Sequence, residues 1–231
     1  MSLPRLRLLP ALLLAIVAVA QPQGARAAAK EVERAVNAVR VLDEIMRTPD
    51  HGVPDSMFDK AEAIAVVPDV VKAGFVLGGR YGRGLLSIRR ADGTWSNPTY
   101  MSVTGGSVGF QAGVQSTDVV LVFRTRRSVD SLVHGKFTLG ADASVAAGPV
   151  GRTATASTDA ALKAEIYSYS RSRGLFAGVA LDGTVLAIDH DSNEQVFGQG
   201  LTPRQIFDGR PQNVPNPIID FRDKLEEYTA R

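Results

Sequence analysis

Apolar residues in the N-terminal part of the chain recur at helical spacing. Between positions 32 and 46 an apolar side chain returns every three or four residues, and Pro49 follows the last of them. This pattern predicts an amphipathic helix that packs on a core and ends before the proline. A second, short helix is expected over residues 55–62.

The spacing changes to a strand pattern at Ala63. From there to about residue 123, apolar positions alternate with polar ones or form short runs. Glycine pairs interrupt these runs at Gly78-Gly79 and Gly105-Gly106, and Asp92-Gly93 does the same. Because glycine adopts the positive φ of tight turns, the pattern predicts antiparallel strands joined at these three places.

Residues 136–152, KFTLGADASVAAGPVGR, combine strand-like alternation with very small side chains. Alternation places Phe137, Leu139, Ala141, Ala143, Val145 and Ala147 on one side of a strand. Glycine weakens an isolated strand, so its repeated use implies that backbone or another element packs closely here. We therefore interpret the small residues as structural.

The C-terminal third predicts one more strand, a hairpin and two helices. A strand is expected from about Glu165, followed by a hairpin about Asp182-Gly183. Thr202-Pro203 begins a short helix that Gly209 ends, and Asn216-Pro217 begins a last helix. Its apolar face consists of Ile218, Phe221, Leu225 and Tyr228.

Together these elements predict a single α+β domain. We expect a strongly bent, largely antiparallel, barrel-like β-sheet, with the N-terminal and C-terminal helices packed on it. No linker divides the elements, and at 231 residues the chain is long enough to bury a large core.

The first 27 residues have the features of a secretory signal peptide. A basic start is followed by the apolar run of residues 8–20, and Ala25-Arg26-Ala27 forms a small-x-small cleavage site. The apolar run is shorter than the roughly 20 residues that a membrane span needs. We therefore expect an exported protein, periplasmic or extracellular, whose mature domain comprises residues 28–231.

Composition excludes several kinds of site. The chain has no cysteine, which excludes disulfides, thiolate metal sites and a cysteine nucleophile. Its net charge of +2 conceals a basic middle: residues 72–173 hold thirteen basic and six acidic residues, whereas the flanking segments are acidic. Such an excess indicates an anionic partner.

Short motifs for catalysis or metal binding lack the context they need. Ser107 lies in a G-x-S-x-G match, but the following residues look extended, whereas a nucleophile elbow needs a helix there. The oxygen-rich residues 189–194 lack the glycine and the final glutamate of a calcium loop, so a polar turn is expected. We predict no enzyme, no cofactor and no metal. A serine hydrolase using Ser107 is a remote alternative.

Basic side chains are the strongest candidates for a function. Each cation near an anionic bilayer contributes about 1 kcal/mol to binding. Export and the scarcity of aromatic residues argue against nucleic acid. The candidates, chosen by charge and position, are Lys72, Arg80, Arg83, Lys136, Arg152, Arg171 and Arg173.

Four stretches, taken in order, resemble the SYLF domain family. They are WSNP, GGSVGFQ, KFTLGADASVAAGPVGR and YSRSRGLFAGV, and the similarity covers residues 53–197. The resemblance implies a lipid-binding module that binds phosphoinositides or other phospholipids without catalysis. In eukaryotic relatives it also implies actin association, which the expected export argues against here.

The sequence thus predicts peripheral, salt-sensitive binding of anionic phospholipid headgroups by an exported domain. The alternative from another class is a structural or protein-interaction module of the cell envelope, whose basic face meets an acidic protein or polysaccharide.

Overall fold

A nine-stranded sheet carries helices on both of its faces. The computed structural model describes residues 23–47, 53–74, 77–108, 113–150, 163–172 and 175–229. The helices are α1 (Gln23–Arg47), α2 (Asp55–Asp59), α3 (Arg126–His134), α5 (His190–Phe197), α6 (Pro203–Phe207) and α7 (Asn216–Thr229). The strands are β1 (Ala63–Gly74), β2 (Leu77–Ile88), β3 (Thr99–Val108), β4 (Gly113–Phe123), β5 (Phe137–Thr138), β6 (Val145–Ala147), β7 (Ile166–Ser172), β8 (Leu175–Gly178) and β9 (Thr184–Ile188).

The sheet has the strand order β5-β9-β3-β2-β1-β4-β7-β6, with β8 also paired to β7. All pairs are antiparallel except β6 with β7. Strands β5 and β6 lie at opposite edges, yet only residues 139–144 connect them. So short a connection requires the edges to approach each other, and the sheet accordingly curls into a half-barrel. The predicted α+β class with a bent, largely antiparallel sheet is confirmed.

The two faces of the sheet cover separate apolar cores. The outer face packs against α1, α2 and α7, with Ile64, Val66 and Leu85 among its buried residues. The inner face, which the curl encloses, packs against α3 and includes Ala65 and Val67. Consecutive residues of β1 thus enter different cores, as the period of two in a strand requires.

Helices α1 and α7, the first and last described elements, pack against each other and on the sheet. The Tyr228 hydroxyl of α7 donates a 2.6 Å hydrogen bond to Asp43 of α1. Trp95, the first residue of WSNP, is buried, and its indole Nε1 donates to Thr229 at 2.9 Å. The guanidinium of Arg89 lies 4.8 Å from the centre of the same indole. The WSNP stretch therefore holds the C-terminal helix in place.

All four predicted helices are confirmed. Helix α1 contains the expected residues 32–46, α2 and α6 lie where short helices were expected, and α7 buries all four residues of its predicted apolar face. No helix in the described part of the chain is long and apolar enough to cross a bilayer. The predicted signal peptide lies mainly outside the described residues, and α1 begins at Gln23, before the expected cleavage site.

Two predicted turns are wrong. Gly78-Gly79 lies within β2 and Gly105-Gly106 within β3, each paired with a neighbouring strand. Only Asp92-Gly93 forms a turn, where Gly93 has a φ of 88°. Glycine within these strands serves close packing: a Cβ on Gly82 would lie 2.8 Å from side-chain atoms of Val67 and Val70.

The predicted hairpin about Asp182-Gly183 is also wrong. Gly183 does turn the chain, with a φ of 72°, but β8 pairs with β7 whereas β9 pairs with β3 and β5. The predicted polar turn over residues 189–194 is instead the start of α5. Asp189 caps that helix, because its carboxylate accepts the Ser192 amide at 3.1 Å.

The small-residue stretch is two strands and not one. Its residues form β5 and β6, separated by a turn at Gly140, where φ is 86°. Asp142 closes this turn by accepting the amide of Thr138 at 2.6 Å. The expectation of close packing is confirmed at Gly148, where an added Cβ would lie 2.0 Å from the ring of Tyr169.

Gly148→Ala therefore places a methyl group inside the volume of a buried ring. We expect it to lower the free energy of unfolding by about 2–3 kcal/mol, measured by urea denaturation. Gly106→Ala is the control, because an added Cβ there meets nothing within 4 Å. Equal stability of the two variants would contradict the packing role of Gly148.

Candidate functional site at the open end of the sheet

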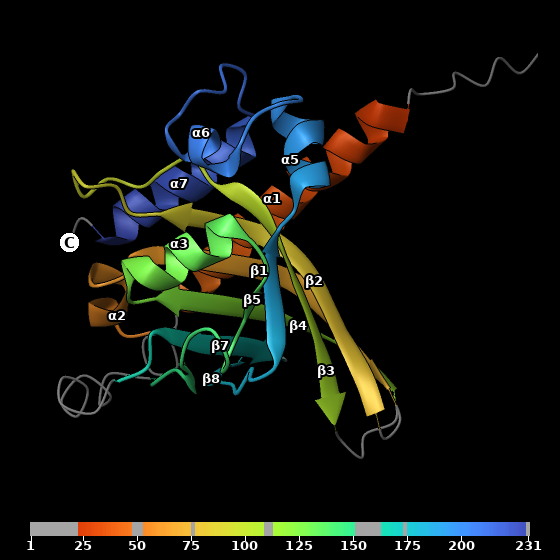
Figure 1. Cartoon of the computed structure of the whole chain (residues 1–231), viewed down its shortest axis with the longest axis vertical. Coiled ribbons are helices and arrows are strands. Elements are labelled where there is room, and N and C mark those ends of the chain that lie inside the picture. The colour runs from red at the N-terminus through yellow and green to blue at the C-terminus, as the bar shows by residue number, and fades with distance from the viewer. Residues whose placement is uncertain are drawn as a thin grey trace, which may run out of the picture.

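One end of the long strands is uncovered. Residues of β1 from Ala63 to Val67 are fully buried, whereas Val71 and Ala73 are exposed. Figure 1 shows the corresponding ends of β2 and β3 extending beyond the helices. We call this region the open end; its described residues are 71–74, 77–81, 104–108 and 113–117.

A β-bulge separates the open end from the covered part. Two residues of β1, Pro68 and Asp69, stand opposite the single residue Asp118 of β4. Asp69 has a φ of 52°, and its amide donates a 3.0 Å hydrogen bond to the Asp118 carboxylate. Because the bulge inserts one extra residue, it reverses which positions of β1 face inward. Even-numbered residues face outward before it and inward after it.

The bulge brings Lys72 and Arg80 together on the inner face. They are Cα partners in the β1–β2 register, and each lies two positions along its strand from an inward-facing residue, Val70 and Gly82. Both side chains are partly exposed. Neither forms an ion pair with a carboxylate of the described residues. The two adjacent cations therefore lack a protein anion in this part of the chain.

Arg80 is also incompletely hydrogen-bonded. Its Nε is buried and has no hydrogen-bond partner among the described residues. Burial lowers the pKa of Arg80 below its ordinary value, because a charged group loses hydration in the protein interior. The charge of Arg80 is thus one that a bound anion would stabilise.

The outer face of the open end is apolar. Val71 and Tyr81 are Cα partners and are 41% and 47% exposed, and Val114 on β4 is 74% exposed. These are three of the five large apolar residues exposed in the described chain. The open end therefore combines free cations on one face with exposed apolar side chains on the other.

Arg83 lies on the opposite face from Arg80 and is fully engaged. Its Nε is 3.1 Å from an Asp189 carboxylate oxygen and donates a 2.5 Å hydrogen bond to the Tyr81 hydroxyl. A second nitrogen is 3.9 Å from the buried carboxylate of Glu31, which also pairs with Arg34. Burial lowers the pKa of Arg83, but the Tyr81 hydrogen bond and the charge of Asp189 outweigh it and raise the pKa. Arg83 joins α1 and the start of α5 to the sheet.

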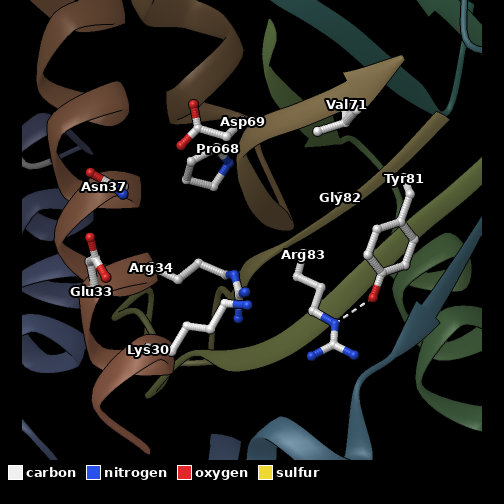
Figure 2. Close-up of a pocket in the computed structure, with 10 residues that line it drawn as sticks. All are labelled: Lys30, Glu33, Arg34, Asn37, Pro68, Asp69, Val71, Tyr81, Gly82 and Arg83. Carbon is white, nitrogen blue, oxygen red and sulfur yellow. Dashed lines mark hydrogen bonds between the residues drawn. The ribbon is translucent and has the colours of Figure 1, made fainter. Parts of the chain in front are cut away.

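A pocket of about 500 Å³ lies between α1 and the sheet beside Arg83. Figure 2 shows Lys30 and Arg34 extending from α1 toward Arg83. Burial and the charge of Arg83 lower the pKa of Arg34. Two acidic residues, Glu33 and Asp69, also line the pocket and offset part of the charge of these three cations. The complete lining is Lys30, Glu33, Arg34, Asn37, Pro68, Asp69, Val71, Tyr81, Gly82 and Arg83. This mixture of charges makes the pocket a weaker anion site than the inner face.

The other predicted basic candidates lie elsewhere. Arg171 on β7 is 3.3 Å from Asp118 and contacts Glu44 of α1. Lys136 is exposed just before β5. Arg152 and Arg173 lie outside the described residues.

A further group of arginines binds backbone carbonyls near α3. Arg89 donates to the carbonyls of Ala61 and Phe58 at 2.9 Å, and Arg90 donates to that of Phe207 at 2.7 Å. These arginines hold loops together. The described basic residues thus occupy several places and do not form one continuous face.

Ser107 does not stand at a nucleophile elbow. It lies within β3, where it pairs with Gly78 of β2, and the next described element is the strand β4. Ser107 is therefore not in the strand-turn-helix context that exposes a catalytic serine.

Comparison with protein families gives a match over residues 104–228 to the Ysc84 model, described as "Las17-binding protein actin regulator". This match covers more than half of the chain. The chain belongs to the Ysc84 (SYLF) domain family. Members of this family are generally non-catalytic binding modules.

Three relatives illustrate the extent of the similarity. LAS seventeen-binding protein 3 of Saccharomyces cerevisiae is 36% identical over 184 residues, which cover 78% of this chain and 39% of the relative. Protein YSC84 of the same yeast is 35% identical over 175 residues, or 74% and 37%. SH3 domain-containing YSC84-like protein 1 of Homo sapiens is 32% identical over 206 residues, or 87% and 59%. The chain spans less than two thirds of each of these relatives.

Sequence reasoning grouped Arg80 with Arg83, although they lie three positions apart on one strand. The period of two in a strand places such residues on opposite faces, and this signal was present in the sequence. Sequence reasoning also missed Lys30 and Arg34, because their helix lies in an acidic segment. Their spacing of four residues in a predicted helix already placed them on one side.

Replacing Arg83 and replacing Arg80 should affect the stability of the fold differently. We expect Arg83→Gln to lower the free energy of unfolding by about 2 kcal/mol, because it leaves the buried Glu31 and Asp189 carboxylates short of a cation. Arg80→Gln is the matched variant on the same strand, and we expect a change of about 0.5 kcal/mol or less. Urea denaturation measures both. A loss for Arg80→Gln as large as that for Arg83→Gln would contradict the assignment of Arg80 as free.

Proposed function

We propose that this domain binds the headgroups of anionic phospholipids, phosphoinositides included, without catalysis, and that its open end is the contact surface. The observation that carries the proposal is the pairing of Lys72 with Arg80 on the inner face, without a carboxylate partner in the described chain. Two unpaired cations side by side attract a polyanionic surface in a way that neutralised arginines such as Arg83 do not.

The apolar residues on the outer face support a bilayer as the anionic partner. A soluble polyanion gives no reason to expose Val71, Tyr81 and Val114 together, whereas the interface of a membrane accommodates both apolar side chains and cations. A tyrosine is suited to that position because its ring is apolar and its hydroxyl is polar.

We expect the binding of this domain to an anionic bilayer to be weak. Lys72 and Arg80 each contribute about 1 kcal/mol near an anionic bilayer. Contact of this kind is peripheral and reversible, and salt weakens it because ions screen exposed charges. An exported location for the protein stays a prediction from its first 27 residues.

Neutralising the two cations tests the electrostatic part of the proposal. We expect Lys72→Gln with Arg80→Gln to weaken binding to vesicles containing phosphatidylserine by about 2 kcal/mol, roughly thirtyfold. Vesicle flotation at low and at raised salt measures this. The matched control is Arg127→Gln with Lys136→Gln, which removes the same charge from exposed positions outside the open end.

Equal losses for the two double variants would indicate that only net charge matters, and the open end would then not be the contact surface. Binding of the wild-type protein that is insensitive to both lipid charge and salt would contradict the electrostatic proposal altogether. It would favour the alternative of a protein-interaction module, in keeping with the Las17-binding description that the family carries.

A second variant tests the apolar part. Val114→Ser removes the most exposed apolar side chain of the open end, and we expect it to weaken vesicle binding by about 1 kcal/mol, roughly fivefold. Val36→Ser is the control, because Val36 is 51% exposed on α1. Neither change should lower stability, since both side chains are already in water. Weaker binding of Val36→Ser alone would place the membrane contact on α1.

A further inference from the structure

Three residues from three neighbouring strands form a row on the inner face of the sheet, where the open end meets the covered part. Arg80 of β2 is the Cα partner of Gly105 of β3, and Gly105 is the partner of Thr184 of β9. Thr184 faces inward, because it lies two positions from the inner-core residue Leu186. The side chains of Arg80 and Thr184 therefore face the same space from either side of a glycine.

Both of these side chains carry a buried polar atom without a partner. Three such atoms occur among the described residues, and two of them are Arg80 Nε and Thr184 Oγ1. Thr184 is fully buried. Buried donors and acceptors in folded proteins are nearly always paired, so an orphaned one calls for an explanation such as an unseen ligand. Two orphaned atoms at one place point to the same ligand.

Gly105 determines how close the two groups come. A Cβ added at this position would lie 3.2 Å from Thr184 Oγ1 and 3.4 Å from the Cγ of Arg80. Both side chains thus lean over the glycine, and a larger residue would push them apart. Gly106, the next residue, faces the other way, and a Cβ there would meet nothing within 4 Å.

Lys72 supplies a second positive charge beside this pair. It is the Cα partner of Arg80 on the side away from Gly105, and it also faces inward. The row therefore presents a guanidinium Nε–H, a hydroxyl and an ammonium group. All three can donate hydrogen bonds to oxygen.

We propose that Arg80, Thr184 and Lys72 form a binding site for a phosphate monoester. Such a group carries close to two negative charges and three free oxygens, which match two cations and a hydroxyl donor. A phosphate diester has one charge and fewer free oxygens and satisfies the site less well. This inference rests on the proposed function in one respect: the monoester is that of a lipid headgroup at the membrane contact surface.

The site is tested with two lipids that differ in this chemistry. Vesicles of phosphatidylcholine with phosphatidic acid present a monoester, and vesicles with phosphatidylglycerol present a diester, with the lipid fractions set to equal surface charge. We expect the wild-type protein to bind the phosphatidic acid vesicles about tenfold more tightly, as an added charge-assisted hydrogen bond would give. Soluble glycerol 3-phosphate should compete with this binding and distinguishes a free phosphate ester from a lipid.

The variants distinguish binding at this site from general electrostatic attraction of the protein to the vesicles. Thr184→Val removes the hydroxyl with little change of shape, and Gly105→Ala inserts a methyl group between the two side chains. We expect both to bind the two kinds of vesicle equally, whereas Gly106→Ala keeps the tenfold preference. Thr184→Val should also unfold at a higher urea concentration without ligand, because it removes an unpaired buried hydroxyl.

The outcomes distinguish this site from the proposed function. If the wild-type protein binds both vesicles without preference, or if Thr184→Val and Gly105→Ala keep the preference, the monoester site is overturned while membrane binding stands. If Thr184→Val is less stable and keeps the preference, the hydroxyl is structural and the site is likewise overturned. If no vesicle binds but glycerol 3-phosphate binds the wild-type protein and not Gly105→Ala, the site stands and the membrane function fails.

Discussion

The strands β1 to β4 are longer than the cores that cover them, and the other features of the molecule depend on this mismatch. Strands β1 and β2 have twelve residues each, which corresponds to about 40 Å of extended chain. Helices and the inner core bury β1 up to the bulge at Pro68 and Asp69 and, just beyond it, Val70. Beyond it the strands remain paired, as between Gly74 and Gly78. The ladder of backbone hydrogen bonds thus continues where the hydrophobic core has ended.

At this uncovered end the strands are paired, but most of their side chains do not pack in a core. In the covered part, a charged side chain is tolerated only when it is paired, as Arg83 is with Asp189 and Glu31. Three positions away on the same strand, and so on its other face, Arg80 has no such requirement. Burial and pairing therefore decide which basic residues are available to a ligand, and the distribution of charge along the sequence does not.

Much of the fold followed from local patterns. The apolar spacing of α1 and α7 was sufficient because their buried faces repeat over several turns. Glycine was the main source of error: the pair Gly78-Gly79 has the composition of a turn, but it lies within β2 and pairs with both β1 and β3. Similarly, the turn at Gly183 was correct, yet the partners of β8 and β9 depend on residues far away in the sequence.

The candidate site was only partly predictable for the same reason. Lys72 and Arg80 were found by their charge, but the bulge that brings them together requires knowing that Asp118 of β4 bonds to Asp69. Proline in a strand is a signal of such a bulge, and Pro68 carried it. Thr184 had no signal at all, since a threonine about eighty residues beyond Gly105 gains its position only through sheet pairing.

The edges of the half-barrel have a consequence for the behaviour of the protein in concentrated solution. One edge is the two-residue strand β5, and the other is shared by β6 and β8, with three and four residues. An exposed strand edge is a template on which another chain can add its own strand, and its danger grows with its length. Strands β1 and β2 have neighbours on both sides, whereas within the described chain β3 and β4 are paired on their outer sides only over residues 101–105 and 118–123. The open end therefore adds free edge along residues 106–108 of β3 and 113–117 of β4, and this is where a second molecule could extend the sheet.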